Sequence, residues 1–174
     1  LNEVELHTYM NCTLEAEKSY TTGGNNPDRP SPNPAKTADG NRIGHPKNQN
    51  GFIADVGSNM IINFTKAYPM TGIILSGMQL SVDENSDGEI PDDILTSDRA
   101  PASYTISYQK EDGKWVNLGT LDTAQKVLTY FEFDEGNEVM VQAVKIHIDG
   151  WARLMEAEAV QMINYTLNGV AKSE

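Results

Sequence analysis

The segment DENSDGEIPDD has a spacing of oxygen-bearing side chains that suits a metal ion. Asp83, Asn85 and Asp87 stand at alternate positions, and Gly88 and Ile90 follow them. In a tightly curled loop alternate side chains point inward, so these oxygens can converge on a single cation. The glycine permits the sharp turn that brings the next backbone carbonyl to the ion. Because calcium is bound by many oxygen ligands of these types, the spacing predicts a calcium loop.

The continuation of this segment departs from a helical calcium-binding motif. Its opening, D-x-N-x-D-G-x-I, resembles the first half of EF-hand and dockerin loops. However, Ile94 stands at the twelfth position, where an EF-hand carries Glu, and Pro91 prevents a regular helix from following. We therefore expect a non-helical exit, in which the carbonyl of Glu89 and the carboxylate of Asp92 or Asp93 complete the ligand set. The alternative is a solvated acidic loop that holds no ion.

Negative charge is concentrated around this segment. The 174 residues carry 13 Lys and Arg against 25 Asp and Glu, which gives a formal net charge of −12. Seven of the acids and none of the bases lie in residues 83–98, so this stretch holds more than half of the excess. Carboxylates at such density repel one another unless they are solvated or hold a cation. The acidic balance also excludes nucleic acid as a partner, because nucleic-acid binders carry clustered cations.

Catalytic chemistry has no matching motif in this chain. There are three histidines, His7, His45 and His147, but no Ser or Cys stands in a nucleophile-elbow sequence. Neither an HExxH pair nor a phosphate-cradling glycine loop occurs. A glycosidase pair remains possible by residue type, yet most of the acids share one loop rather than a rigid cleft. The single cysteine, Cys12, rules out an internal disulfide and suits a small buried thiol, so we expect no enzymatic activity.

Sugar recognition needs an aromatic face for the C–H side of the ring and planar polar groups for its hydroxyls. Trp151 and Arg153 in IDGWARL supply an indole and a guanidinium fork. We place a ligand site where this loop meets a second one, whose candidate side chains are Arg42, His45, Asn48, Asn50 and Phe52. Residues 42–52 carry cations and no acid, which suits an acidic sugar. The alternative for Trp151 is that it closes the end of the core.

The elements that must position these loops are β-strands. Apolar and polar residues alternate with a period of two in residues 104–108, 129–133 and 144–148. Shorter strand-like runs lie between turn residues at 60–64, 72–75 and 115–118. Residues 155–162 suit a helix or a strand, and residues 21–51, rich in proline and glycine, predict one long loop. We expect His147 on a solvent-facing side. Many short strands predict a sandwich or a barrel.

The length of the chain fits one domain over residues 1–174. No stretch approaches the roughly 20 apolar residues that a membrane-spanning helix needs. We therefore expect no membrane insertion.

Four segments resemble elements of one known family. They are PNPAKTADGN, MIINFTKAYPMTGIIL, SYTISYQKEDGKWVNLGT and VQAVKIHIDGWARLMEAEAV, and they span about residues 30–163. The family is the coagulation-factor type C or discoidin domain, whose bacterial branch includes the carbohydrate-binding modules of family 32. The resemblance implies an all-β jelly-roll β-sandwich of the galactose-binding-domain-like kind, with ligand-binding loops at one end. It also implies that Trp115, which stands where the family has a packed Trp, lies in the core.

The same resemblance implies a structural calcium ion. Its ligands would be Asp39 and Glu156, with Glu158 as the register alternative to Glu156. The alternative for Asp39 is that it merely favours a tight turn before Gly40. Galactose specificity is not implied, because the acidic segment replaces the aromatic-proline-arginine element of galactose-binding members. Residues 42–45 also differ from the family pattern, which has a Thr and then a Trp there.

The function that the resemblance implies is non-catalytic carbohydrate binding within a larger secreted or cell-surface protein. Such a module would hold an attached enzyme, for example a glycoside hydrolase, near its glycan. We expect a monomer whose partners are a glycan and neighbouring domains, with calcium as its cofactor. The alternative is a structural or protein-interaction β-sandwich without sugar binding. The missing arginine element and an aromatic content of 7% favour that alternative.

Overall fold

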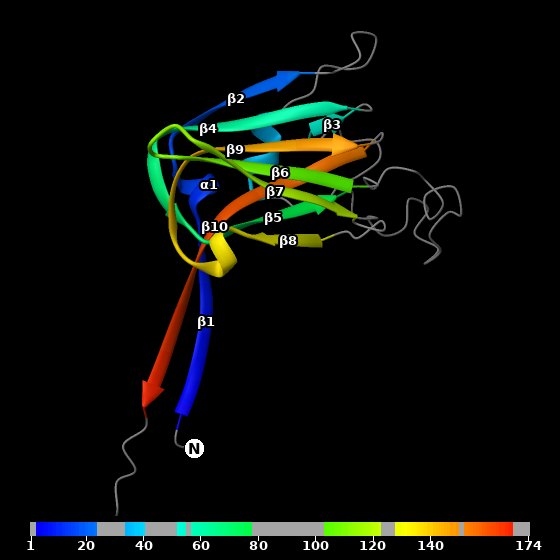
Figure 1. The fold of residues 1–174 in the computed structure, drawn as a ribbon. Coiled ribbons are helices and arrows are strands. Elements are labelled where there is room, and N and C mark those ends of the chain that lie inside the picture. The colour runs from blue at the N-terminus through cyan, green and yellow to red at the C-terminus, as the bar shows by residue number, and fades with distance from the viewer. Residues whose placement is uncertain are drawn as a thin grey trace, which may run out of the picture.

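The computed structural model describes residues 3–23, 34–40, 52–54, 57–77, 103–122, 128–149 and 152–168. Two antiparallel sheets face each other in it (Figure 1). The first sheet has the order β1 (Glu3–Asn11), β10 (Ala152–Asn168), β5 (Gly72–Gly77), β8 (Leu128–Glu132), and β3 (Phe52–Ala54) also pairs with β10. The second sheet has the order β2 (Lys18–Gly23), β4 (Ser58–Met70), β9 (Val139–Asp149), β6 (Ser103–Lys110), β7 (Trp115–Asp122). The all-β sandwich predicted from the sequence is therefore confirmed.

Short helical turns connect the sheets. They are α1 (Cys12–Glu15), η1 (Pro34–Ala38) and η2 (Asp134–Gly136). Asn11 caps α1, because its Oδ1 accepts the N–H of Leu14 at 3.0 Å. This single turn carries the chain from β1 in the first sheet to β2 in the second. Among the residues that the structure describes, no helix is long and apolar enough to cross a membrane.

The core lies between the sheets and is filled by the inward half of each alternating pattern. Tyr104, Ile106 and Tyr108 of β6 are buried, whereas the residues between them are partly exposed. The ring of Tyr108 stacks on Phe133 at 4.7 Å, and Tyr104 meets Phe131 edge-on at 6.4 Å. These ring pairs join the second sheet to the strand and turn of the first, which fixes how the two layers face each other.

Two sequence-based expectations of local structure can now be compared with the fold. Residues 155–162, for which helix and strand were both open, form strand, and they pair with β5 up to Val160 and with β1 from Val160 onward. Ladder pairing thus outweighs the helical propensity of Glu and Ala. The proline-rich stretch 21–51 is not entirely loop, because β2 runs to Gly23 and η1 lies within it. β1 was not predicted.

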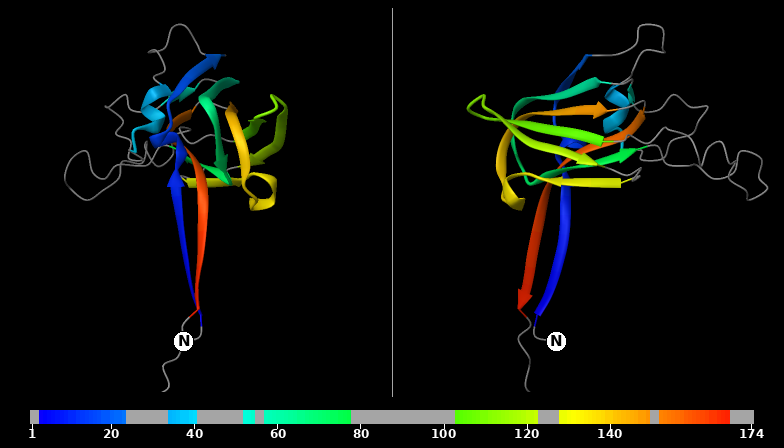
Figure 2. Two further views of the ribbon diagram at one scale, coloured as in Figure 1. Left: turned by 90° about the vertical axis from the view of Figure 1, so that its left-hand side faces the viewer. Right: turned by 45° about the vertical axis from the view of Figure 1, so that its right-hand side comes forward.

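The second half of β10 continues past the sandwich as a two-stranded ribbon with β1 (Figure 1 and both views of Figure 2). The ribbon is paired from Glu3 opposite Asn168 to Asn11 opposite Val160. The first half of β10 instead pairs with β5 and β3 in the body of the first sheet. The ribbon therefore points away from the end of the sandwich at which β10 begins. We call that end, where β3 also lies, the loop end.

Candidate functional site

The two segments that the sequence assigns to a ligand site are joined at the loop end. β3 pairs with the first residues of β10, so that Ile53 lies opposite Arg153. Trp151 comes one residue before β10, and residues 42–51 lead into β3. The two loops are therefore anchored on neighbouring strands rather than at opposite ends of the sandwich.

Most of the candidate ligand-binding side chains lie outside the described residues, namely Trp151, Arg42, His45, Asn48 and Asn50. Of Arg153 the structure describes the backbone alone. Phe52 is described, and it is fully buried in the hydrophobic core. It stands opposite Leu154, which is also buried, so both side chains fasten β3 and β10 to the core. The prediction that Phe52 contacts a sugar is therefore wrong.

The Asp39–Gly40 turn meets Glu156 in space. The N–H of Gly40 donates to Oε1 of Glu156 at 3.1 Å, although 116 residues separate them in the chain. Gly40 has φ +79°, a left-handed conformation that glycine adopts without strain. Glu156 is fully buried in β10, against which η1 packs, while Asp39 is exposed and pairs with Lys36 at 3.9 Å. The structure thus brings together two of the residues assigned to calcium from the family resemblance.

Glu158, the register alternative, is also buried and lies opposite Ile74 of β5. The hydrogen bond of the turn is made to Glu156 and not to Glu158. Glu156 is therefore the residue that a metal at this turn would use.

The charge of Glu156 acts on two residues of β2. Burial raises the pKa of the Tyr20 phenol to about 12, and the Glu156 carboxylate adds to that rise. Burial lowers the pKa of Lys18, and here the negative charge of Glu156 acts in the opposite direction. The Lys18 ammonium also donates to the carbonyl of Ala16 at 3.3 Å. Glu156 is therefore surrounded by β2, η1 and the turn rather than by water.

The donors around Glu156 fit a calcium ion by type. Carboxylates from Glu156 and Asp39, with carbonyl oxygens of the turn, are the oxygens that calcium binds. Within the described part of the chain no three His, Cys, Asp or Glu side chains are grouped as a metal site, so carbonyls would supply much of the shell. The candidates of the acidic segment, Asp83, Asn85, Asp87, Glu89, Asp92 and Asp93, lie outside the described residues. Calcium binding at both places remains a prediction.

Trp115 is placed differently from its sequence-based prediction. It is 45% exposed, so the expectation that it lies in the core is wrong. Its neighbours in β7, Val116 and Leu118, are partly buried and pack against the core, which turns Trp115 to the outside of the second sheet. The alternation in WVNL indicates this orientation, whereas the family resemblance implied a packed Trp at this position.

Two further sequence-based assignments concern single residues. Cys12 is buried, as expected, and burial raises the pKa of its thiol. His147 lies on the outward side of β9 and is half-buried. Its Nδ1 is 2.9 Å from Oδ1 of Asn59 on the neighbouring strand β4. His147 is therefore a cross-strand partner on the outside of the second sheet.

Sequence comparison finds neither a matching protein-family model nor a matching curated protein. Solved structures do resemble the fold. The family 32 module of C. perfringens NanJ, in complex with galactose, has a TM-score of 0.58 and 11% identity, covering 90% of this chain and 100% of that one. A pectin-binding carbohydrate-binding module has a TM-score of 0.52 and 16% identity, covering 83% and 91%.

A third similar structure contains an enzyme domain as well. Truncated AlyQ, with family 32 carbohydrate-binding and alginate lyase domains, has a TM-score of 0.56 and 11% identity, covering 91% of this chain and 34% of that one. At such identities the likeness concerns the fold. This chain has the discoidin-like β-sandwich fold of the family 32 carbohydrate-binding modules.

Proposed function

We propose that this chain is a non-catalytic carbohydrate-binding module whose ligand site lies at the loop end. The observation that carries this proposal is the pairing of Ile53 with Arg153, which anchors the two candidate loops on adjacent strands. An indole from Trp151 would cover one face of a sugar ring. The guanidinium of Arg153 would donate to two adjacent hydroxyls.

The fold supports the ligand class. Among the solved structures that share it, one holds galactose and another binds pectin. The sugar bound by this chain need not be either of these, because residues 42–45 and the acidic segment differ from the galactose-binding pattern.

We further propose that the module belongs to a larger secreted or cell-surface protein and holds an attached enzyme near its glycan. The AlyQ structure supports this arrangement, since the shared fold there accompanies an alginate lyase domain. A non-catalytic module would accelerate such an enzyme by raising its local concentration on the substrate. We expect the module itself to turn over no substrate.

A glycan array probed with the isolated chain tests the ligand site. We expect Trp151→Ala to abolish binding to uncharged glycans and Trp151→Phe to keep most of it, because the aromatic face is retained in Trp151→Phe. Arg153→Gln should weaken binding by leaving the sugar hydroxyls without their paired donors. Circular dichroism should show that all three variants are folded. A silent array would favour a structural or protein-interaction module instead, and unchanged binding by Trp151→Ala would contradict the site.

We also propose that calcium binds in the acidic segment. The ligands would be Asp83, Asn85, Asp87, Asp92 or Asp93, and the carbonyl of Glu89. Calorimetric titration of the metal-stripped chain should give heat with calcium, and Asp87→Ala should remove one binding event. Absence of heat at millimolar calcium, or the same titration curve for Asp87→Ala, would contradict a calcium loop there.

A further inference from the structure

The outside of the second sheet carries an open hollow of about 300 Å³. Its lining comes from four neighbouring strands, Ile61 of β4, Lys145 of β9, Ser107 of β6 and Trp115 of β7. Three of these residues stand in one row of the sheet, because Ile61 pairs with Lys145 and Lys145 pairs with Ser107. With strands about 4.8 Å apart, a row across four strands is roughly 15 Å long. We call this surface the outer face.

The aromatic group of the outer face is accessible. Trp115 is 45% exposed and borders the hollow, with the apolar side chain of Ile61 also lining it. An exposed indole at the edge of a shallow depression offers a flat apolar surface of the kind on which the C–H face of a sugar ring stacks.

Polar groups around the hollow are held in place by cross-strand and turn hydrogen bonds. Asn63 Nδ2 donates to Thr21 Oγ1 at 3.1 Å, and the His147 ring bonds to Asn59. Gln109 Nε2 donates to the carbonyl of Gly113 at 2.9 Å. Amide, hydroxyl and imidazole groups fixed in this way retain further donors and acceptors for ligand hydroxyls and lose little entropy on binding.

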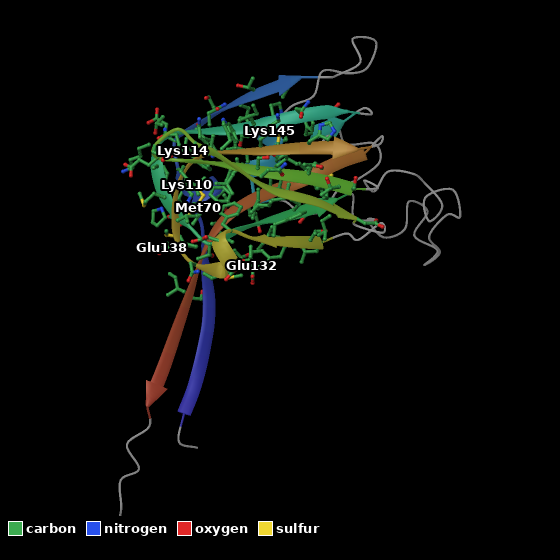
Figure 3. The ribbon with its side chains drawn as sticks, viewed as in Figure 1. Met70, Lys110, Lys114, Glu132, Glu138 and Lys145 are labelled. Carbon is green, nitrogen blue, oxygen red and sulfur yellow. The ribbon has the colours of Figure 1, made fainter. Side chains whose placement is uncertain are left out.

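The charge of the outer face is opposite in sign to that of the whole chain. Figure 3 shows Lys145 on the second sheet, with Lys114 at the β6–β7 end of it. Lys114 pairs with Asp112 at 3.1 Å, whereas within the part of the chain that is described no carboxylate pairs with Lys145. The outward positions around the hollow carry amides and hydroxyls instead, at Asn63, Thr105, Gln109 and Asn117.

Acids of the second sheet lie away from the hollow. Asp122 and Asp149 both stand opposite Ser103, at the loop end of their strands. The Lys145 ammonium is a positive charge on a protein of net charge −12, and by charge complementarity it favours an anionic ligand. We therefore propose that the outer face binds an oligosaccharide that contains uronic acid, with one ring on Trp115 and a carboxylate at Lys145. This site is distinct from the one at the loop end, and it does not depend on the loop-end site being correct.

The two tryptophans of the chain allow the two sites to be separated. In the Trp151→Phe variant Trp115 is the sole tryptophan, so its fluorescence reports on the outer face. Titration with an oligogalacturonate should change that fluorescence to saturation. The fully methyl-esterified form of the same oligosaccharide, which lacks the charge, should bind more weakly. Added salt should weaken binding of the acidic oligosaccharide and leave binding of the esterified one nearly unchanged.

Affinity electrophoresis in polygalacturonate then compares matched variants. Trp115→Ala should weaken binding about tenfold, the scale of a lost aromatic contact. Lys145→Gln should weaken it about two- to fivefold, the scale of an exposed ion pair. Lys66→Gln is the control, since it removes the same charge from a residue that lies over the Tyr68 ring and not at the hollow. It should leave binding unchanged.

Three results would overturn the proposal. The first is no fluorescence change in Trp151→Phe while the wild type binds the probe, which would place binding at the loop end alone. The second is wild-type affinity in both Trp115→Ala and Lys145→Gln. The third is no binding of the probe to any folded variant. Loss of array binding to uncharged glycans in Trp151→Ala would leave this inference untouched, whereas loss of uronate binding in that variant would contradict it, so the two proposals fail separately.

Discussion

The N–H of Gly40 donates to the buried Oε1 of Glu156, and this hydrogen bond ties a surface turn to the central strand of the first sheet. Glu156 is fully buried, and a buried carboxylate is costly to desolvate unless it is paired or hydrogen-bonded, so the N–H of Gly40 is one of the contacts that hold it in place. A cation at this turn would add a further favourable interaction with the carboxylate. The hydrogen bond between Gly40 and Glu156 is therefore relevant both to the stability of the fold and to the proposed calcium binding.

Two substitutions of Glu156 separate these roles. Glu156→Gln keeps an oxygen that accepts the Gly40 N–H but removes the charge. Glu156→Ala removes both, and the lost hydrogen bond should lower the free energy of unfolding by about 1–3 kcal/mol without calcium. We expect calcium to raise the melting temperature of the wild type more than that of either variant, because only the acidic segment would still bind calcium in the variants. The measurement is thermal unfolding with calcium and with chelator, and an equal rise in Glu156→Gln would exclude this carboxylate as a ligand.

Thr13 should stabilise the fold through one buried hydrogen bond. Its Oγ1 accepts the N–H of Ala159 at 2.7 Å, at the point where β1 has ended and α1 has begun. Thr13→Val has the same shape but leaves that N–H without an acceptor, so we expect a loss of about 1–3 kcal/mol in urea unfolding. Thr13→Ser retains the hydroxyl and should lose less. Equal stability of the Val and Ser variants would show that the hydrogen bond does not contribute.

Alkaline pH should destabilise the chain through Tyr20. Its phenol loses a proton at about pH 10 in the unfolded chain and at about pH 12 in the folded one. Over this interval the unfolded state binds fewer protons, so the free energy of unfolding falls as pH rises. Buried Tyr104, whose pKa is also raised, acts in the same direction.

Lys18 has the opposite effect, because its lowered pKa lets the folded chain release that proton first. The informative comparison is therefore between the wild type and Tyr20→Phe, each unfolded in urea across this interval. Stability should fall less steeply with pH in Tyr20→Phe. Parallel curves would mean that Tyr20 ionises equally in both states.

Gly72 should be intolerant of a side chain. A Cβ there would lie 2.4 Å from the carbonyl oxygen of Phe131 and 2.6 Å from the ring of Tyr130. The backbone oxygen cannot move without disturbing the β5–β8 ladder, so Gly72→Ala should cost about 1–3 kcal/mol. Gly23→Ala is the matched control, because nothing lies within 4 Å of a Cβ at that position. Unfolding midpoints in urea compare the two, and similar midpoints would refute the steric argument.

Local alternation predicted the strands whose two faces differ in environment. Tyr104 and Ile106 face the core while Thr105 faces outward, so a period of two was visible. The strand at 155–162 was ambiguous, because Met, Glu and Ala also favour a helix. Burial of Glu156 and Glu158 was not predictable either, because η1 and α1, which pack against β10, come from distant parts of the chain. Packing of distant segments over a strand is not visible in the pattern of apolar and polar residues within that strand.

The segments that form the candidate site could be predicted from the sequence. The burial of individual side chains could not, because it depends on packing between distant segments. The strands that follow the two candidate loops, β3 and the start of β10, pair with each other, which is what a site shared by those loops requires. Phe52 was misassigned, because a lone aromatic after a long loop carries no sign of which side it faces. The hollow at Trp115 was missed because its lining comes from four strands that are distant in sequence.

The ribbon of β1 and β10 determines how the chain can be attached to anything else. Residues 3 and 168 form a pair at its tip, which projects below the sandwich in Figure 1 and lies away from β3. A tag, resin or sensor surface coupled near either position is held off by the ribbon, and the loop end then faces the solution. The two positions are also close enough to serve as entry and exit points for splicing residues 3–168 into a surface turn of a host protein. Such a graft would act as an orientable adaptor, with its coupling point at the tip of the ribbon and its proposed sugar site at the loop end.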